Sequence, residues 1–302
     1  MDGSDDEMIP AEPGPLATPE ERLRYRAAAF LEEGLAFIDR HGDEFARLRT
    51  RLLLEARPLE EGLAAVQSAC EEPDGPQPLG LARQGAAGLV RFAEANPPAP
   101  WLGSLEALIV LADLNALGSP GVGVIAQRLA TLQSEDGGWG APSDAAADRI
   151  FATGLTAGHL ARTRVVRPEV LASAGTFMAS VWSGDALNGR AWPALAAFGS
   201  WFSSVGDQDE LADGALQQVG RELERGFRQG VYTAVETVRV LLHCDASAVP
   251  GAGLVPGELL EAILAEQGED GGVAELVDGP DTLRVMPTFD AMLGAIRLCG
   301  VI

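Results

Sequence analysis

Lysine is missing from this chain of 302 residues, and its 22 basic residues are all arginines. This absence excludes a Schiff-base lysine, and with it pyridoxal phosphate chemistry. It also excludes a P-loop, because that phosphate-binding loop needs a Gly-Lys-Ser/Thr sequence. We therefore expect no cofactor.

Cysteine is almost as scarce. The chain has three cysteines, Cys70, Cys244 and Cys299, which are widely spaced and lie in or beside apolar segments. An odd number at such spacing does not predict a disulfide framework. We interpret the three as buried free thiols in a reducing cytoplasm.

Positive charge is in short supply overall, because the net charge is −22 and the isoelectric point is near 4.4. Binding to nucleic acid or to anionic lipid needs clustered cations, so neither is expected. No uncharged apolar run reaches the roughly 18 residues that a membrane span needs. Residues 1–19 are acidic and rich in proline and glycine, which predicts a disordered tail and not a signal peptide. We expect a cytoplasmic protein whose composition suggests a GC-rich bacterial genome.

The rest of the chain, residues 20–302, reads as a single all-α domain. Thr18-Pro-Glu-Glu21 is a helix start, and helical pattern follows to about Arg57 with a break near His41. No stretch alternates with period two, so no sheet is predicted. Unusually apolar segments then recur, at 79–93, 101–117, 149–161, 192–205, 232–244 and 288–299. Amphipathic segments lie between them, at 121–133, 168–181, 210–227 and 256–266.

A turn sequence also recurs. Gln133-Ser-Glu-Asp-Gly-Gly-Trp139 has a degraded copy in Gln267-Gly-Glu-Asp-Gly-Gly-Val273, and the first glutamine of each lies 134 residues from the other (267 − 133). Helical repeats usually run about 30 to 50 residues, so this distance suggests three units of roughly 45. Each hairpin of such an array buries its apolar helix between neighbours. The pattern favours apolar inner helices and amphipathic outer helices, in a closed double ring or an open superhelix.

Gln133, Gly137 and Trp139 resemble the Q-x-x-x-G-x-W repeat of terpenoid cyclases and of protein prenyltransferase β subunits. The segment Asp148–Leu160, which follows this turn, is similar to the start of an inner helix in those families. With the hairpin pattern, the resemblance covers about residues 60–302 and implies an (α/α)6 toroid. We expect the three residues to be structural, with Gln133 capping backbone amides, Gly137 forming a left-handed turn and Trp139 covering it.

The resemblance implies two possible chemistries, zinc-dependent prenyl transfer and acid-initiated cyclisation of a polyene. No histidine follows Cys244, and the adjacent His243 and Cys244 would point about 100° apart on a helix, so we expect no zinc site. A strict Asp-x-Asp-Asp motif is absent. Its closest match, Asp207-Gln-Asp209-Glu210, makes Asp209 the candidate general acid with Asp207 beside it. The alternative is that these acids cap the helix that begins near Glu210.

Further candidate acids lie near the starts of inner helices. Glu106, Glu236 and Asp290 each follow a Ser or Thr by two or three residues in an otherwise apolar stretch, and Asp148 is a fourth candidate. The inner helices of such a toroid surround a central funnel. If these helices are parallel, the acids would form a ring at the mouth of the funnel and could donate a proton. Capping and compensation of the helix dipole are the alternative explanation.

The expected wall of the funnel is apolar and partly aromatic. Aromatic faces stabilise a carbocation, although an aromatic stripe on a helix is also ordinary core. The candidate substrate-binding residues are Phe151, His159, Trp192, Phe198, Trp201, Tyr232 and Phe289.

Two functions follow from this reading. The first is a cyclase that folds an isoprenoid or polyene in the funnel and protonates it. The second is a non-catalytic toroid that binds a hydrophobic ligand, or that works with a protein partner or as a homodimer. The chain is short for a cyclase built from two helical domains and lacks the strict acid motif, which counts against the first function. The first function is nevertheless the one that we expect, with the second as its alternative.

Overall fold

Every regular element that the computed structural model describes is helical, which confirms the all-α prediction. The structure describes residues 18–54, 59–70, 79–81, 84, 88–95, 98–205, 210–274 and 279–302. The expected tail lies almost entirely outside this part of the chain. In place of strands, the described residues contain an isolated antiparallel bridge between Gln267 and Val273.

The N-terminal region consists of α1 (Pro19–His41), α2 (Glu44–Leu53) and α3 (Leu59–Cys70). The predicted helix start is confirmed, because Thr18 and Glu21 form a reciprocal capping box. The break expected near His41 is confirmed as well. Asp43 accepts a hydrogen bond from the Ala46 amide and caps the next helix.

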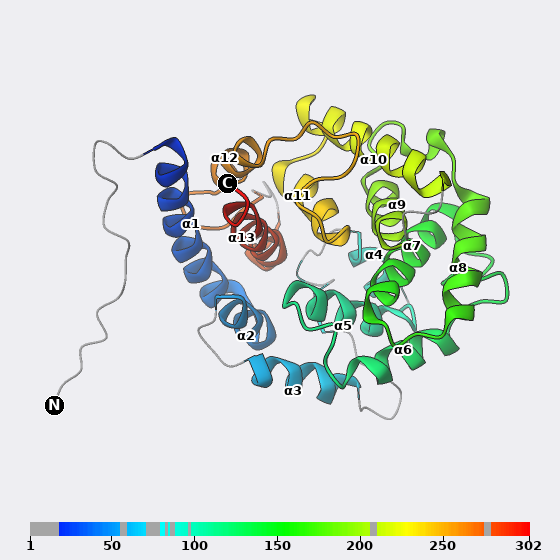
Figure 1. Ribbon diagram of the computed structural model, residues 1–302. Coiled ribbons are helices and arrows are strands. Elements are labelled where there is room, and N and C mark those ends of the chain that lie inside the picture. The colour runs from blue at the N-terminus through cyan, green and yellow to red at the C-terminus, as the bar shows by residue number, and fades with distance from the viewer. Residues whose placement is uncertain are drawn as a thin grey trace.

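The apolar segments form an inner set of helices, which Figure 1 shows surrounded by other helices. Each inner helix packs against the next one along the chain. In α5 every residue is buried, as an element enclosed on all sides requires. The inner set comprises α5 (Leu102–Asp113), α7 (Ala146–Thr163), α9 (Trp192–Ser204), α11 (Ala234–His243) and α13 (Val285–Cys299).

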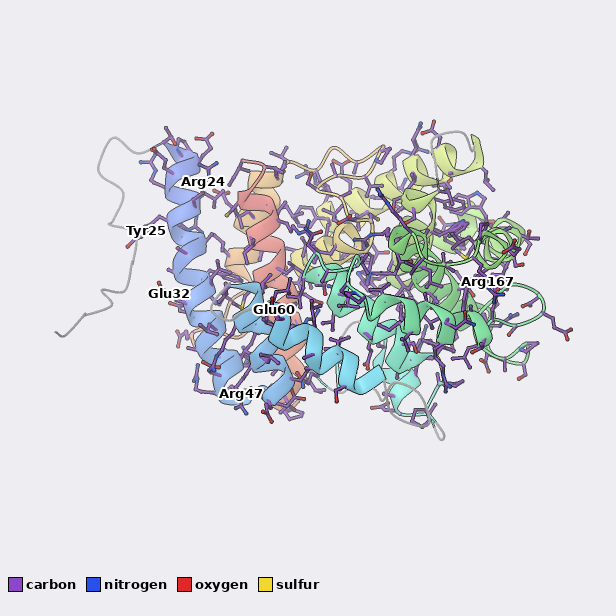
Figure 2. The ribbon with its side chains drawn as sticks, turned by 60° about the horizontal axis from the view of Figure 1, so that its bottom comes forward. Arg24, Tyr25, Glu32, Arg47, Glu60 and Arg167 are labelled. Carbon is purple, nitrogen blue, oxygen red and sulfur yellow. The ribbon has the colours of Figure 1, made fainter. Side chains whose placement is uncertain are left out.

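The amphipathic segments form an outer set, which buries a single stripe of each helix. In α12, for example, Leu259, Leu260 and Ile263 are the buried residues. Figure 2 shows the exposed side chains of Glu32 on α1 and Arg167, just before α8, on opposite sides of the molecule. Besides α1 and α3, the outer set comprises α6 (Val122–Thr131), α8 (Pro168–Val181), α10 (Glu210–Arg228) and α12 (Pro256–Ala265).

Two short 3₁₀ helices, η2 (Gly184–Leu187) and η3 (Asp281–Arg284), precede inner helices α9 and α13. Of the described residues in 79–93, only Val90–Ala93 are α-helical, as α4. The prediction of an inner helix over 79–93 is therefore wrong for this part. Gly80 and Gly88 have φ angles of +83° and +77°, which a right-handed helix does not contain. Gly88 also lies so close to the Phe151 ring that a Cβ would approach it to 2.6 Å.

The first and last helices of the chain lie side by side. Helix α1 packs against both α12 and α13 (Figure 1). The Arg24 guanidinium on α1 donates to the carbonyl oxygen of Ile302. Among the described residues, no helix is both long and apolar enough to cross a membrane.

Candidate functional site

The recurring turns were the strongest sequence signal, and the structure gives the first of them a network of backbone contacts. The Gln133 turn (residues 133–139) joins α6 to α7. The Gln133 side-chain amide donates to the carbonyls of Gly137 and of Val170 on α8, at 2.9 Å each. The expectation that Gln133 caps backbone amides is wrong, because its nitrogen donates to carbonyls instead. Gly137 has a φ of +88°, as expected for a left-handed turn.

The Gln267 turn (residues 267–273) joins α12 to η3 and α13 and repeats this geometry. Gln267 donates to the carbonyls of Gly271 and of Phe30, at 3.0 Å each. In the Gln133 turn the second carbonyl acceptor, Val170, lies on α8. In the Gln267 turn the corresponding acceptor, Phe30, lies on α1 at the opposite end of the chain. A Cβ at Gly271 would overlap the Glu33 carbonyl on α1.

Each turn is also held by an arginine of the following segment. Arg149 bonds Asp136 at 2.7 Å, and Arg284 bonds Asp270 at 2.6 and 2.9 Å. The Arg284 guanidinium lowers the pKa of Asp270 to about 2. The two guanidiniums stack on Phe177 of α8 and Phe37 of α1, each 4.8 Å from the ring centroid.

The two turns differ in their last residue. Trp139 is fully buried, and its indole donates to the Leu129 carbonyl at 3.0 Å. Its backbone amide bonds the Thr153 hydroxyl at 2.9 Å, and Val273 makes the same bond to Thr288. Valine thus keeps the backbone contact of the turn and loses the indole bond to the preceding helix.

Four buried charged residues meet inside the inner set, and we call them the ionic cluster: Arg49, Asp113, Arg239 and Asp290. They come from α2, α5, α11 and α13, and each is less than a tenth exposed. Arg239 donates to both oxygens of Asp113 and to Asp290, at 3.2 Å each. Arg49 donates to Asp113. Two positive and two negative charges therefore offset one another in a largely buried setting.

Burial has opposite effects on the acid and the imidazoles of this region. It raises the pKa of Asp290 to about 6, although Arg239 acts in the other direction. It lowers the pKa of His159 to about 3 and places that of His243 well below its usual range. The two imidazole centroids are 5.4 Å apart. Both histidines are therefore neutral near pH 7, whereas Asp290 is partly protonated.

A small cavity adjoins the ionic cluster. Its volume is about 10 Å³, which is space for about one water molecule. The buried Nδ1 of His243, which belongs to the cavity wall, has no hydrogen-bond partner in the structure. Among the predicted acids, Asp290 lines this cavity. The other lining residues are Leu81, Leu89, Ile109, Leu155, Arg239, His243 and Met286.

The other predicted acids have different partners. Glu236 closes a capping box with Thr233, and its oxygen lies 3.4 Å from Arg190. Glu106 is buried and accepts a hydrogen bond from the Leu79 amide at 2.7 Å.

These acids do not share one set of contacts at the starts of the inner helices. Helix α13 begins at Val285, three residues before the expected Thr288. Asp290 is therefore in its second turn, deeper than the predicted ring. The fourth candidate, Asp148, pairs with Arg91 at 2.9 Å.

Part of the predicted aromatic wall lies around the interior. Phe151, Trp192, His243 and His159 form a row with successive centroid separations of 6.3, 6.4 and 5.4 Å. The Arg49 guanidinium lies over the Phe289 ring, with 3.9 Å between its Cζ and the ring centroid. The row therefore runs from α7 through α9 to His243 of α11 in the cavity wall, and ends at His159 of α7.

The remaining predicted wall residues contact the outer set, which corrects their expected place. Phe198 packs against Trp182 at the end of α8, with centroids 4.9 Å apart, and Trp201 lies against Gly175 of α8. Tyr232 packs on Gly226 of α10, and its hydroxyl donates to the Gly189 carbonyl. These rings fill the space between the layers, because α9 is apolar on both sides. The candidate acids Asp207 and Asp209 lie outside the described residues.

Two larger hollows open on the surface where inner helices end. One has a volume of about 440 Å³ and the other about 340 Å³. Both include Ile296 and Arg297 in their walls, so they adjoin. The first is also lined by Leu52, Leu53, Leu59, Asp113, Leu114, Asn115 and Leu293. The second is also lined by Leu242, Asp245, Ala246, Ser247, Gly300 and Val301. We call the pair the terminal groove.

The sequence reasoning missed Arg49, Asp113, Arg239 and Arg297. For Arg239 a signal was present, because it stands alone in the apolar run Val238-Arg-Val-Leu-Leu242. Asp113 stands likewise within Leu111-Ala-Asp-Leu114. Charged residues in segments assigned to the inside predict a buried partner of opposite sign.

Within the described residues, no three His, Cys, Asp or Glu side chains are grouped to hold a metal ion. Cys244 and Cys299 are free thiols, buried and half-buried respectively. Comparisons with protein-family models, with curated proteins and with solved structures find no match to this chain. The function is therefore argued from the geometry.

Proposed function

We propose that the chain is a closed α/α toroid that binds a hydrophobic ligand without transforming it. One observation carries the proposal: the terminal groove offers about 440 and 340 Å³, whereas the cavity beside Asp290 offers about 10 Å³. Pockets for small molecules usually measure roughly 300 to 1,000 Å³. The groove is of the right size for a ligand and the cavity is too small.

The contacts between the chain ends support a closed toroid. Helix α1 packs against the Gln267 turn in the same way as α8 packs against the Gln133 turn. The same glutamine, glycine and arginine contacts hold both helices. Helix α1 is thus the outer helix of the last repeat, and an open superhelix would leave that turn without a partner.

The contacts of those predicted acids that the structure describes support a non-catalytic role. A general acid must reach the atom that it protonates. Glu236 is engaged in a capping box and Asp290 in an ion pair, and Glu106 bonds a backbone amide. These contacts are structural.

The test uses purified protein with a panel of prenyl diphosphates and linear polyenes. We expect a ligand-induced rise in Tm without new products in mass spectrometry. Ile296→Trp should abolish this rise in Tm, because Ile296 lines both hollows and the larger indole ring would occupy their space. Val124→Trp on α6 is the matched control, since Val124 is 55% exposed and lines neither hollow. Turnover of a panel member would refute the non-catalytic part of the proposal.

A second candidate function is acid-initiated cyclisation, and a specific observation favours it. Asp290 has a pKa near 6 beside a cavity with mostly aliphatic walls and a row of aromatic rings. A carboxyl that is partly protonated near neutral pH is suited to donate a proton. The substrate would have to displace groups that now enclose the cavity.

The same panel tests this second function. A cyclised product that is lost in Asp290→Asn and kept in Glu236→Gln would identify Asp290 as the acid. Loss in Asp209→Asn alone would assign the reaction to Asp209 instead. Absence of both turnover and a Tm shift would contradict both functions and favour a protein partner.

A further inference from the structure

The charges in the walls of the terminal groove are not equally available. The groove is mainly aliphatic, with leucines from α2, α3 and α13, and Leu114 just after α5, lining its larger hollow. Three charged residues belong to its walls: Asp113, Asp245 and Arg297. The polarity of a ligand therefore depends on which of the three is already neutralised.

Both carboxylates have close arginine partners. Asp113 accepts hydrogen bonds from Arg49 and Arg239 in the ionic cluster and is 7% exposed. Asp245, whose side chain is 49% exposed, pairs with Arg162 at 3.1 Å and with Arg297 at 3.9 Å. Each of the two carboxylates therefore has two guanidinium partners, so neither carries a negative charge in excess of the arginines beside it.

Arg297 shares the Asp245 carboxylate with Arg162, which holds it more closely. The Arg297 side chain is 44% exposed, and its ion pair with Asp245 spans 3.9 Å, which is long for a charge-assisted bond. It stands in the wall that the two hollows have in common. A guanidinium at the edge of an aliphatic groove combines a donor fork with apolar surface.

We infer that the terminal groove binds a single-chain amphiphile with an acidic head group, with the chain against the leucines and the head on Arg297. This inference rests on the proposed binding function and adds the ligand class. A free amphiphile fits better than a membrane, because hollows of about 440 and 340 Å³ have the size of a pocket for a single small molecule. The competing role of Arg297 is to offset the negative end of the α13 dipole, since it lies in the last turn.

The experiment compares four C12 probes below their micelle concentrations by calorimetry: laurate, dodecyl phosphate, dodecanol and dodecyltrimethylammonium. The two acidic probes should bind most tightly and the cationic probe most weakly. Arg297→Gln should weaken laurate binding about fivefold, as for a partly exposed ion pair, and leave dodecanol unchanged. Arg225→Gln is the control, because Arg225 is exposed on α10 and lines neither hollow.

The outcomes separate the inference from the function on which it rests. Equal binding of laurate and dodecanol, or equal effects of the two arginine substitutions on laurate, would refute the head-group assignment and leave a hydrophobic binding site. A lower Tm for Arg297→Gln with unchanged laurate affinity would assign Arg297 to dipole compensation and refute the inference. If no C12 probe binds, the inference and the proposed function both fail.

Discussion

Gln267→Ala should weaken the contact between the two ends of the chain. The substitution removes two hydrogen bonds, to Gly271 and to Phe30 on α1, each 3.0 Å long. A hydrogen bond contributes about 1 kcal/mol net, so the loss is about 2 kcal/mol. In a chain of this size we expect Tm to fall by roughly 4 °C.

Gln133→Ala is the matched control, because Gln133 makes the same two bonds at 2.9 Å within one continuous stretch of chain. Both variants should lose similar stability in chemical denaturation. Only Gln267→Ala should release α1, which hydrogen exchange of residues 19–41 would report as faster exchange. Unchanged protection of α1, or equal exposure in the two variants, would refute the claim that this turn holds the ends together.

Three further predictions concern the backbone and the buried titratable groups. Gly271→Ala should lower the free energy of unfolding more than Gln267→Ala does, because Gly271 has a φ of +85° and a Cβ there would overlap the Glu33 carbonyl. Gly230→Ala is the control: its φ is +65° but the space around it is open, so urea denaturation should show a loss of only about 1 kcal/mol. The pKa of Asp290 is raised to about 6 in the folded state, so its contribution to stability falls as pH rises from about 4 to about 6. This fall amounts to about 3 kcal/mol at most. Urea denaturation at pH 4 and at pH 7 measures it, and Asp290→Asn should abolish this part of the difference between the two pH values. Burial lowers the pKa of His159 to about 3, so its contribution to the free energy of unfolding is fully present above the unfolded pKa of about 6.5 and is lost as pH falls. At pH 5 the loss is about 2 kcal/mol. His159→Gln should therefore make the free energy of unfolding less dependent on pH between 7 and 5.

The local pattern of the sequence was enough to predict the hairpins. Helix α8 occupies the predicted residues 168–181, and α9 begins at the predicted Trp192. Proline at the first turn, glycine in the turns and an apolar or amphipathic face are local signals, so they do not depend on the rest of the fold. The same reading failed at 79–93, where composition predicted a helix. There Gly88 is fixed by its close approach to Phe151, a residue 63 positions further along the chain (151 − 88).

The site was predicted less well because its contacts are set by distant segments. Three expected wall residues, Phe198, Trp201 and Tyr232, contact the outer set. An inner helix is apolar on every side, so its pattern does not indicate which face is turned inward. Asp290 was found because an acid in an apolar stretch is conspicuous, but its depth in α13 depended on a helix start three residues earlier than predicted.

The ionic cluster and the joining of the chain ends depend on each other. Arg49 is 64 residues from Asp113 and Arg239 is 126 residues from it, so no local signal pairs them. Arg49 lies on α2, directly after α1, and reaches the interior because α1 is held against α13 by the Gln267 turn. If α1 were released, Asp113 would lose one of its two arginine partners, and an unpaired buried charge is costly. The Gln267 turn therefore stabilises the centre of the molecule as well as its edge.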